Sequence, residues 1–203
     1  MHFEPDSALI AVVPQTMQVI RFADLAPVPW RNGGGVTREI ATAPYDGEPG
    51  SFRWRVSIAD VTSEGPFSAF EEVDRQIVLV EGAGMVISVD EQPHRLDLFD
   101  VLAFPGDAPC VGTLVDSPTR DLNVMTRRGL ASAGVQIVSI ADAPAVQADA
   151  DAECLLVALT GSMSVATADE AVHVDRFDTV RLAGPAAVEL TGTGRVAVVD
   201  VQA

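Results

Sequence analysis

Short apolar runs separated by turn-forming residues constrain this chain more than any other feature of its sequence. The runs are rich in Val, Ile, Leu and Phe, and clusters of Gly, Pro, Asp and Ser stand between them. Such spacing is typical of β-strands joined by turns. No segment has the length and the period of an amphipathic helix. The sequence therefore predicts an all-β protein, built as an antiparallel sandwich or barrel.

Two segments alternate in a way that assigns their side chains to faces. From Phe52 to Asp60, one face is expected to carry Phe52, Trp54, Val56 and Ile58, and the other Arg53, Arg55, Ser57 and Ala59. The first face is expected to pack against a core. From Asp121 to Met125, Asp121, Asn123 and Met125 share a face, which either meets solvent or lines a polar cavity. Further short strands are expected at 76–81, 85–89, 101–104, 110–115 and 122–126.

The charge of the chain excludes several partners. Its 13 basic residues stand against 29 acidic ones, which gives a net charge of −16. A negative field of this size opposes phosphate backbones and anionic lipid surfaces, so nucleic acid and membrane are not expected as partners. All 13 basic residues are arginine, and the lack of lysine excludes Schiff-base and P-loop chemistry. Ten of the arginines lie in residues 1–128; they either recognise an anion or form surface ion pairs.

An internal repeat indicates two similar halves. The segment from Leu79 to Gly106 aligns with the region from Leu159 to Gly184, and both contain an acidic pair, a histidine and Phe-Asp in the same order. The acidic stretch 141–151 has the composition of a linker. We therefore expect a first barrel at 17–135, a linker at 136–150 and a second, degenerate barrel at 151–203, with strands that can be shared. Residues 1–16 are interpreted as an N-terminal extension.

The remaining ionisable side chains do not form a recognisable metal or redox site. Cys110 and Cys154 stand in apolar runs without CxxC spacing, which favours buried free thiols. His94 and His173 each stand alone in their repeat, beside acidic pairs, and are interpreted as solvated turn residues. We expect no metal and no cofactor. The N-terminal segment has acids in place of a basic region, and its apolar run is too short to span a bilayer, so a cytoplasmic protein is expected.

A glycine-rich segment, Trp30 to Ile40, is the most unusual in the chain. Three consecutive glycines, Gly33 to Gly35, are normally kept for positive φ or for close approach of the backbone to a ligand. The spacing fits neither a P-loop nor a dinucleotide fingerprint. Two interpretations remain open: a ligand-binding turn flanked by Trp30, Asn32 and Thr37, or a bulge between strands.

The two halves resemble a duplicated cupin barrel, and several motifs resemble the HutD/Ves family of bacterial bicupins in particular. These motifs are W-R-N-G-G-G-x-T-R-E-I, F-R-W-R-V-S-I-A-x-V, G-P-F-S-x-F, D-R, F-P-G-D and D-L-N-V-M-x-R-R-G, and they run from residue 17 to about 129. The resemblance implies an RmlC-like jelly-roll bicupin that forms a homodimer and has a metal-free pocket. It also implies a regulatory role in histidine utilisation and a small acidic ligand, such as formylglutamate, formiminoglutamate or urocanate. The segment Phe70 to Asp74 departs from the family pattern, in which Phe-Pro-Gly often precedes Asp-Arg.

The ligand class implied by this resemblance assigns roles to residues in the motifs. A carboxylate calls for a guanidinium, and Arg55 is the first choice because it shares a strand face with Ser57. Arg75 is the second choice, although Asp74 offers it a structural partner. The full set of expected ligand-binding residues is Trp30, Asn32, Gly33, Gly34, Thr37, Arg55, Ser57, Arg75 and Asn123.

An enzyme is the alternative to a binding protein. A cofactor-free hydrolase or isomerase would need an acid or base in the pocket, and Glu39, Asp60 and Asp121 are the carboxylates available in the motifs. None of them has a sequence-adjacent partner that would tune its pKa. We therefore favour binding over catalysis. A structural partner-binding module is the third possibility, which a large exposed apolar patch would favour.

Overall fold

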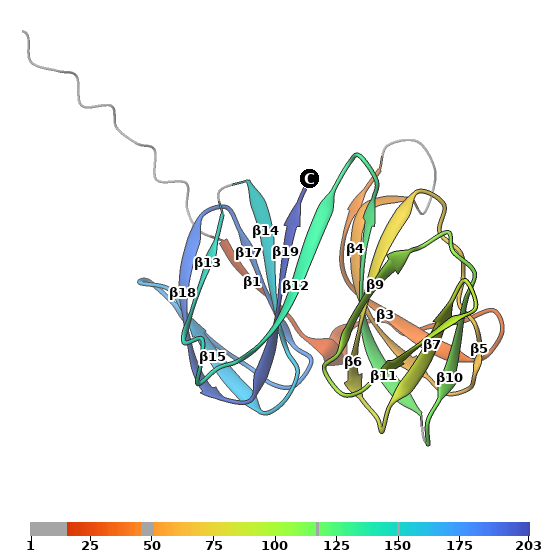
Figure 1. The fold of residues 1–203 in the computed structure, drawn as a ribbon. Coiled ribbons are helices and arrows are strands. Elements are labelled where there is room, and N and C mark those ends of the chain that lie inside the picture. The colour runs from red at the N-terminus through yellow and green to blue at the C-terminus, as the bar shows by residue number, and fades with distance from the viewer. Residues whose placement is uncertain (1–15, 46–50, 117, 150) are drawn as a thin grey trace, which may run out of the picture.

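Strands make up almost all of the secondary structure in the computed structural model, which describes residues 16–45, 51–116, 118–149 and 151–203. The strands form four sheets, every strand pair is antiparallel, and a single turn of 3-10 helix, Phe22–Asp24, stands among them. The sheets pair into two barrels that lie side by side (Figure 1). The prediction of a duplicated all-β, cupin-like fold is confirmed. Within the described ranges no helix is long and apolar enough to cross a membrane.

The first barrel packs a six-stranded sheet against a four-stranded sheet. In spatial order the larger sheet contains β2 (Val28–Pro29), β3 (Gly35–Pro44), β4 (Phe52–Val61), β11 (Thr119–Arg127), β6 (Val73–Glu81) and β9 (Val101–Pro105). The smaller sheet contains β5 (Gly65–Pro66), β10 (Cys110–Leu114), β7 (Met85–Val89) and β8 (Gln92–Leu96). Ile77 and Leu79 of the larger sheet meet Met85 and Ile87 of the smaller one in a core without solvent exposure. Burial of these side chains holds the two sheets together.

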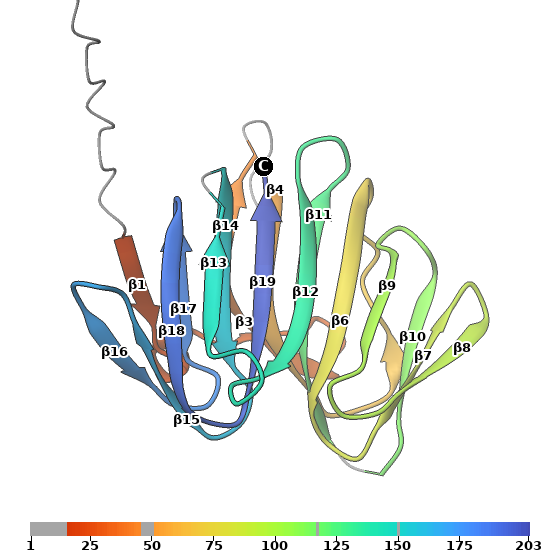
Figure 2. The same cartoon turned by 60° about the vertical axis from the view of Figure 1, so that its left-hand side comes forward.

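The second barrel has the same two-sheet plan. Its five-stranded sheet contains β1 (Thr16–Ile20), β17 (Thr179–Ala183), β14 (Ala152–Ala158), β19 (Arg195–Gln202) and β12 (Ser132–Ser139). Its four-stranded sheet contains β13 (Ala145–Ala148), β18 (Ala186–Thr193), β15 (Ser162–Ala166) and β16 (Ala171–Val174). In Figure 2, which is turned by 60° from Figure 1, strands β13–β19 of the second barrel lie on the left and strands β6–β10 of the first barrel lie on the right. An apolar core fills the space between the two sheets of this barrel.

The chain is divided between the barrels differently from the predicted boundaries. β1 pairs with β17 and β12 pairs with β19, so both strands lie in the second barrel. The expected first-barrel range 17–135 and the expected linker 136–150 therefore contain second-barrel strands, β13 among them. β1 and β12 are the two edge strands of this sheet, and each satisfies the backbone groups on one side of its neighbour. Of the predicted extension, residues 1–15 lie outside the described part of the chain.

The repeat appears in the backbone as the same turn built twice. Phe99 and Phe177 both have positive φ, 74° and 70°. Their N–H groups donate to the carbonyls of Leu79 and Ala158 at 2.8 and 2.6 Å. The preceding hairpins differ: Val89 pairs with Gln92 across a two-residue turn, whereas the β15–β16 hairpin closes over residues 167–170. His94 and His173 therefore occupy different positions in their ladders, and both are exposed.

One face of β4 packs between the barrels rather than inside its own. Trp54, Val56 and Ile58 lie in a cluster that also contains Leu155 and Val199 of the second barrel. The predicted alternation is wrong for Phe52. The β3–β4 register shifts at this end of β4, so Arg53 is an extra residue. The bulge turns Phe52 away from Trp54 and toward Val73 and Met125.

Candidate functional site

A cavity of about 670 Å³ opens in the first barrel. Seven of the nine residues predicted to bind a ligand line it: Trp30, Asn32, Thr37, Arg55, Ser57, Arg75 and Asn123. Gly33 and Gly34 are not among the lining residues. The volume is in the range of small-molecule sites in proteins.

Strand register places the inward side chains next to one another. Met125 of β11 is directly opposite Arg55 of β4 on one side and Arg75 of β6 on the other. Two residues along β11, Asn123 is opposite Ser57 in the same way. Cross-strand neighbours of this kind lie about 5 Å apart at Cβ. The strand register thus places two arginines from distant motifs in one row at the cavity.

Arg75 forms the inner, buried part of the cavity wall and is only 3% exposed. Its Nη2 donates to Oδ1 of Asn123 at 2.8 Å, and its Nη1 lies 3.4 Å from the Ser68 carbonyl. Nε has no hydrogen-bond partner among the described residues. The rings of Phe67, Phe70 and Phe104 surround the guanidinium at 5.1 to 5.5 Å from their centroids. Burial lowers the pKa of Arg75 to about 10, so it remains a cation at neutral pH.

Asp121 lies behind Asn123 and has no solvent exposure. Its Oδ1 accepts a hydrogen bond from Nδ2 of Asn123, and its Oδ2 has no partner in the described structure. Burial raises the pKa of Asp121 to about 7, against the opposing effects of Arg75 and Asn123. The polar face predicted for β11 is therefore an internal one.

Arg55 stands nearer the surface, with its side chain 23% exposed. Its Nε is 3.5 Å from Oε2 of Glu39 but makes no hydrogen bond there. The guanidinium also lies 5.9 Å from the Phe52 ring centroid. Since Glu39 is itself half exposed, the pair is weak. Arg55 thus keeps donors available to a molecule in the cavity.

The glycine-rich segment forms one rim of the cavity. Asn32 Oδ1 accepts from the Gly34 N–H at 3.0 Å, and Gly33 has a φ of 73°. A Cβ on Gly35 would lie 2.5 Å from the Asp60 carbonyl and 3.0 Å from the Trp30 indole. Two uses of such glycines were predicted. Gly33 has the positive φ. At Gly35 the backbone approaches other atoms closely, and those atoms belong to Asp60 and Trp30 of the protein itself.

Aromatic side chains close the same rim. Trp30 Nε1 donates to Thr37 Oγ1 at 2.8 Å, which fixes the indole against β3. The Trp30 and Phe67 rings meet edge to face with centroids 5.7 Å apart. Phe67, Ser68 and Phe70 line the cavity as well, and they are not among the predicted ligand-binding residues. The motif that contains them, Gly65-Pro-Phe-Ser-Ala-Phe70, is one of the segments that resemble the family.

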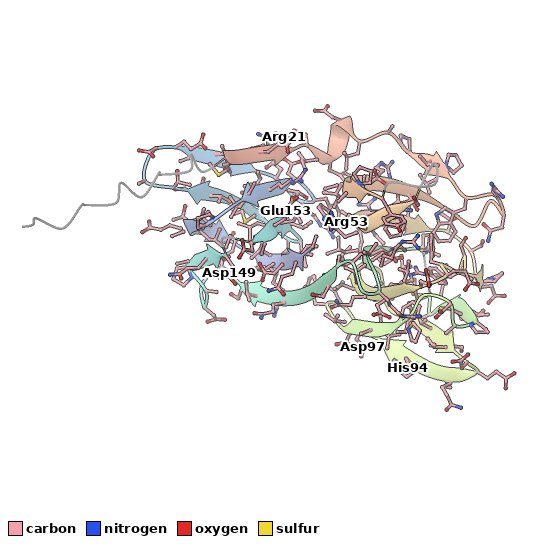
Figure 3. All side chains as sticks on the ribbon, turned by 90° about the horizontal axis from the view of Figure 1, so that it is seen from above. Arg21, Arg53, His94, Asp97, Asp149 and Glu153 are labelled. Carbon is pink, nitrogen blue, oxygen red and sulfur yellow. The ribbon has the colours of Figure 1, made fainter. Side chains whose placement is uncertain are left out.

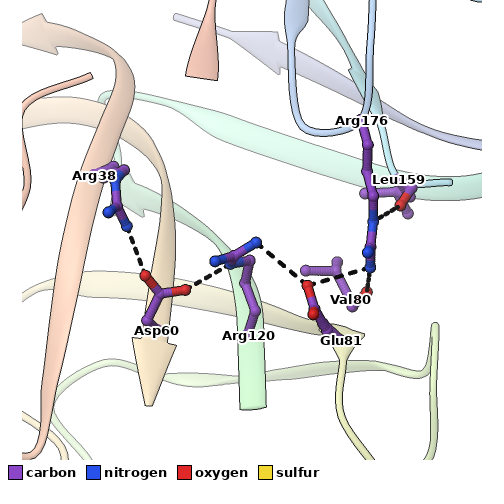
Figure 4. Close-up of polar contacts among 7 residues, drawn as sticks. All are labelled: Arg38, Asp60, Val80, Glu81, Arg120, Leu159 and Arg176. Carbon is purple, nitrogen blue, oxygen red and sulfur yellow. Dashed lines mark hydrogen bonds and ion pairs between the residues drawn. The ribbon is translucent and has the colours of Figure 1, made fainter. Parts of the chain in front are cut away.

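Most of the other first-half arginines form structural ion pairs. Arg38 and Arg120 both donate to the Asp60 carboxylate at 2.6 Å, and Arg120 also pairs with Glu81 (Figure 4). Glu81 in turn pairs with Arg176 of the second barrel at 3.3 Å (Figure 4). Partial burial alone would raise the pKa of Asp60, but its hydrogen bonds to the two arginines lower it. Asp60 is therefore a structural anion between the barrels.

Arg75 does not pair with Asp74, the partner that its place in the sequence suggested. Asp74 instead accepts a hydrogen bond from Arg128 at 2.8 Å. Arg128 also forms a two-bond contact with Asp107, at 2.8 and 3.0 Å. Alternation along β6 explains the difference, because Asp74 and Arg75 point to opposite faces of the sheet.

Residues away from the cavity have no comparable surroundings. His94 and Asp97 lie on an outer part of the first barrel (Figure 3), and Arg53 is exposed as well. Within the described ranges, no three His, Cys, Asp or Glu side chains gather as a metal site. Cys110 and Cys154 are buried and free, and burial raises the pKa of both thiols.

The second barrel differs from the first at the position of Arg75. Ala158 and Leu79 accept the same turn hydrogen bond, and four residues before them stand Cys154 and Arg75. Cys154 is fully buried in the apolar core of its barrel. At this position the second barrel has a buried thiol beside Asp200, whereas the first barrel has a guanidinium at a cavity.

The family description HutD matches residues 22–199, which is most of the chain. This protein belongs to the HutD family.

Two curated relatives each match somewhat more than half of this chain. An uncharacterised 21.2 kDa protein from the hutC 3′ region of Pseudomonas putida is 41% identical over 110 residues, 54% of this chain and 57% of the relative. Protein Ves of Citrobacter koseri is 37% identical over 123 residues, 58% of this chain and 63% of the relative. The matched segments thus span less than two thirds of these relatives.

Solved structures similar to this HutD protein extend over nearly the whole chain. HutD from Pseudomonas fluorescens SBW25 aligns with a TM-score of 0.77 at 30% identity, covering 92% of this chain and 98% of that one. A conserved protein of unknown function, PA5104 of Pseudomonas aeruginosa PAO1, aligns with a TM-score of 0.79 at 29% identity and the same coverage. A cupin 2 barrel protein from Leptotrichia buccalis aligns at 12% identity with a TM-score of 0.57, over 90% of this chain and 99% of that one, and shows the shared fold alone.

Proposed function

We propose that this HutD protein binds a small acidic metabolite of histidine breakdown in the first-barrel cavity and acts as a regulatory protein of that pathway. The observation that carries the proposal is the charge of the lining. Arg31, Arg55 and Arg75 line the cavity, and the described lining residues include no carboxylate. In a chain of net charge −16, such a site selects an anion locally against an unfavourable overall field.

The neutral polar groups of the cavity suit the other end of such a ligand. Asn32, Thr37 and Ser57 line it together with the arginines, and they supply donors and acceptors for an amide, a formyl group or an imidazole ring. The name of the Pseudomonas putida relative, which places it in a hutC 3′ region, supports the pathway. Formylglutamate, formiminoglutamate and urocanate are the ligands to test first.

Calorimetric titration with these three acids tests the proposal. We expect at least one to bind, and Arg55→Gln to weaken binding about tenfold or more, because a charge-assisted hydrogen bond contributes about 1.5–3 kcal/mol. Arg53→Gln is the matched control, since Arg53 is exposed on the same strand and does not line the cavity. No heat with any of the acids and folded protein would exclude this ligand class.

The regulatory part of the proposal needs a readout in cells. A strain that produces the Arg55→Gln protein should show the same altered growth on histidine as a strain without the gene. If the deletion strain is impaired and the variant strain grows normally, the biological role does not depend on the cavity. The expected homodimer belongs to the same proposal, and sedimentation equilibrium tests it.

A cofactor-free enzyme is the second candidate, and Asp121 is the observation that favours it. This carboxyl lies one side chain behind the cavity and has a pKa of about 7, which suits acid or base catalysis. Glu39 and Asp60 do not line the cavity. Proton NMR of the three acids incubated with the protein decides between the candidates, because conversion of any of them would require an enzyme.

A further inference from the structure

Three buried side chains form a hydrogen-bonded line that ends at the cavity. Arg75, Asn123 and Asp121 are 3%, 4% and 0% exposed. Asn123 accepts from Arg75 through Oδ1 and donates to Asp121 through Nδ2. The opposite orientation would put the amide NH2 against the guanidinium, which is only a donor, and the amide oxygen against the carboxylate, which is only an acceptor. The two charged neighbours therefore fix the orientation of the Asn123 amide.

Asn123 lies between two opposite charges and forms a hydrogen bond with each. Asp121 compensates the charge of Arg75 across the amide but accepts none of the guanidinium hydrogens itself. Nε of Arg75 has no partner among the described residues, and Nη1 has only the 3.4 Å contact to Ser68. Arg75 is thus neutralised electrostatically while part of its hydrogen-bonding capacity stays unused.

We infer that Asp121 takes up a proton from solvent when an anion binds to Arg75. This inference rests on the proposed function. In the buried part of the site one guanidinium, Arg75, faces one carboxylate, Asp121, whereas Arg55 stands nearer the surface beside Glu39. A bound carboxylate would add a second negative charge beside the same guanidinium, in surroundings where unpaired charge is costly. Protonation of Asp121 removes the excess charge and leaves Asn123 and Arg75 in place.

The surroundings of Asp121 identify it as the group that changes its charge. Burial raises its pKa to about 7, while Arg75 of β6 and the Asn123 hydrogen bond lower it and Asp60 of β4 raises it. Arg75 stays protonated, since its pKa is about 10 even though burial and the charge of Arg55 lower it. Cys110 of β10 also faces Arg75, and burial raises the pKa of its thiol, so it remains neutral.

Calorimetry with formylglutamate as the probe measures the proton directly. Titrations in two non-carboxylate buffers of different ionisation enthalpy, at about pH 8, give the number of protons taken up per anion bound. We expect a value approaching one, and a dissociation constant that rises by up to about tenfold per pH unit above about pH 7. Formate serves as a second probe, because it contains the carboxylate alone.

Two variants distinguish protonation of Asp121 from a general effect of the protein's net charge. Asp121→Asn removes the proton acceptor, so binding should proceed without proton uptake and without this pH dependence. Asp97→Asn makes the same change in net charge at an exposed site (Figure 3) and should keep both. If Asp121→Asn does not fold, carbon NMR of the Asp121 carboxyl in the wild type, with and without the probe, reports the same protonation.

The outcomes distinguish this inference from the proposed function. Binding of the probe with no proton uptake and with a pH-independent affinity would overturn the inference and leave the anion site intact. If neither formate nor any of the three metabolites shifts the Nε–H resonance of Arg75, the inference and the proposed function are both wrong. Proton uptake that persists in Asp121→Asn would assign the proton to another group and would also overturn the inference.

Discussion

Replacement of Gly35 by alanine probes the contact that shapes the cavity rim. The added Cβ would lie 2.5 Å from the carbonyl oxygen of Asp60, and 3.0 and 3.1 Å from two indole carbons of Trp30. Ordinary carbon contacts are about 3.5–4.0 Å. The Asp60 carbonyl cannot rotate away, because Val36 pairs with Asp60 in the β3–β4 ladder. The ladder must therefore shift at this point, and Trp30 must move as well.

The expected cost of Gly35→Ala is that of overpacking, about 1–3 kcal/mol of unfolding free energy. Alanine substitutions at two other glycines serve as comparisons for this cost. Gly33→Ala meets nothing within 4 Å but has a φ of 73°, which costs about 1–2 kcal/mol. Gly134→Ala in β12 meets nothing within 4 Å, and its φ is not in the left-handed region, so it should be neutral or slightly stabilising.

Urea unfolding followed by circular dichroism ranks the unfolding free energies of the three variants. Calorimetry with formylglutamate measures how the altered rim changes binding. We expect Gly35→Ala to weaken binding as well, since Trp30 lines the cavity, whereas Gly134→Ala should leave affinity unchanged. A Gly35→Ala protein as stable as Gly134→Ala would refute the argument that packing against Asp60 and Trp30 requires this glycine.

Three further predictions concern charge and hydrogen bonding. Trp30→Phe removes the bond to Thr37 and should cost about 1 kcal/mol of stability in urea. Arg120→Met should raise the pKa of Asp60, seen by carbon NMR, because it removes one of two hydrogen bonds that lower it. The folded-state pKa of Asp121 is raised, so the folded state binds its proton more tightly than the unfolded state does. Unfolding free energy should therefore fall as pH rises from about 4 to 7, and this loss should be absent in Asp121→Asn, as urea titrations across this range would show.

Local pattern was sufficient to predict several strands and the alternation of β4 from Trp54 onward. Met85–Val89 has the predicted bounds, and Arg55 and Ser57 point into one cavity as the alternation indicated. The prediction was wrong for Phe52, because a bulge depends on the register with the neighbouring strand and not on the strand's own residues. The boundaries of the barrels were missed for the same reason, since β1 and β12 find their partners far away in the chain.

The arginine bias in the first half was only partly a sign of function. Arg31, Arg55 and Arg75 line the cavity, whereas Arg38 and Arg120 hold Asp60 between the barrels. Sequence cannot separate these roles, because all five stand in motifs of similar composition. The difference arises from which strand face meets a cavity and which meets the second barrel.

The sequence by itself determined that this protein is a duplicated β-structure with the recognisable motifs of its family, because strand period and turn residues act over short stretches of chain. Only the tertiary structure decided that Arg75 does not pair with Asp74 and instead forms a buried hydrogen-bonded line with Asn123 and Asp121. Those three side chains come from two strands that meet only when the sheet forms. Burial there removes the solvent that would otherwise screen their charges, and the chemistry of the site follows from that removal.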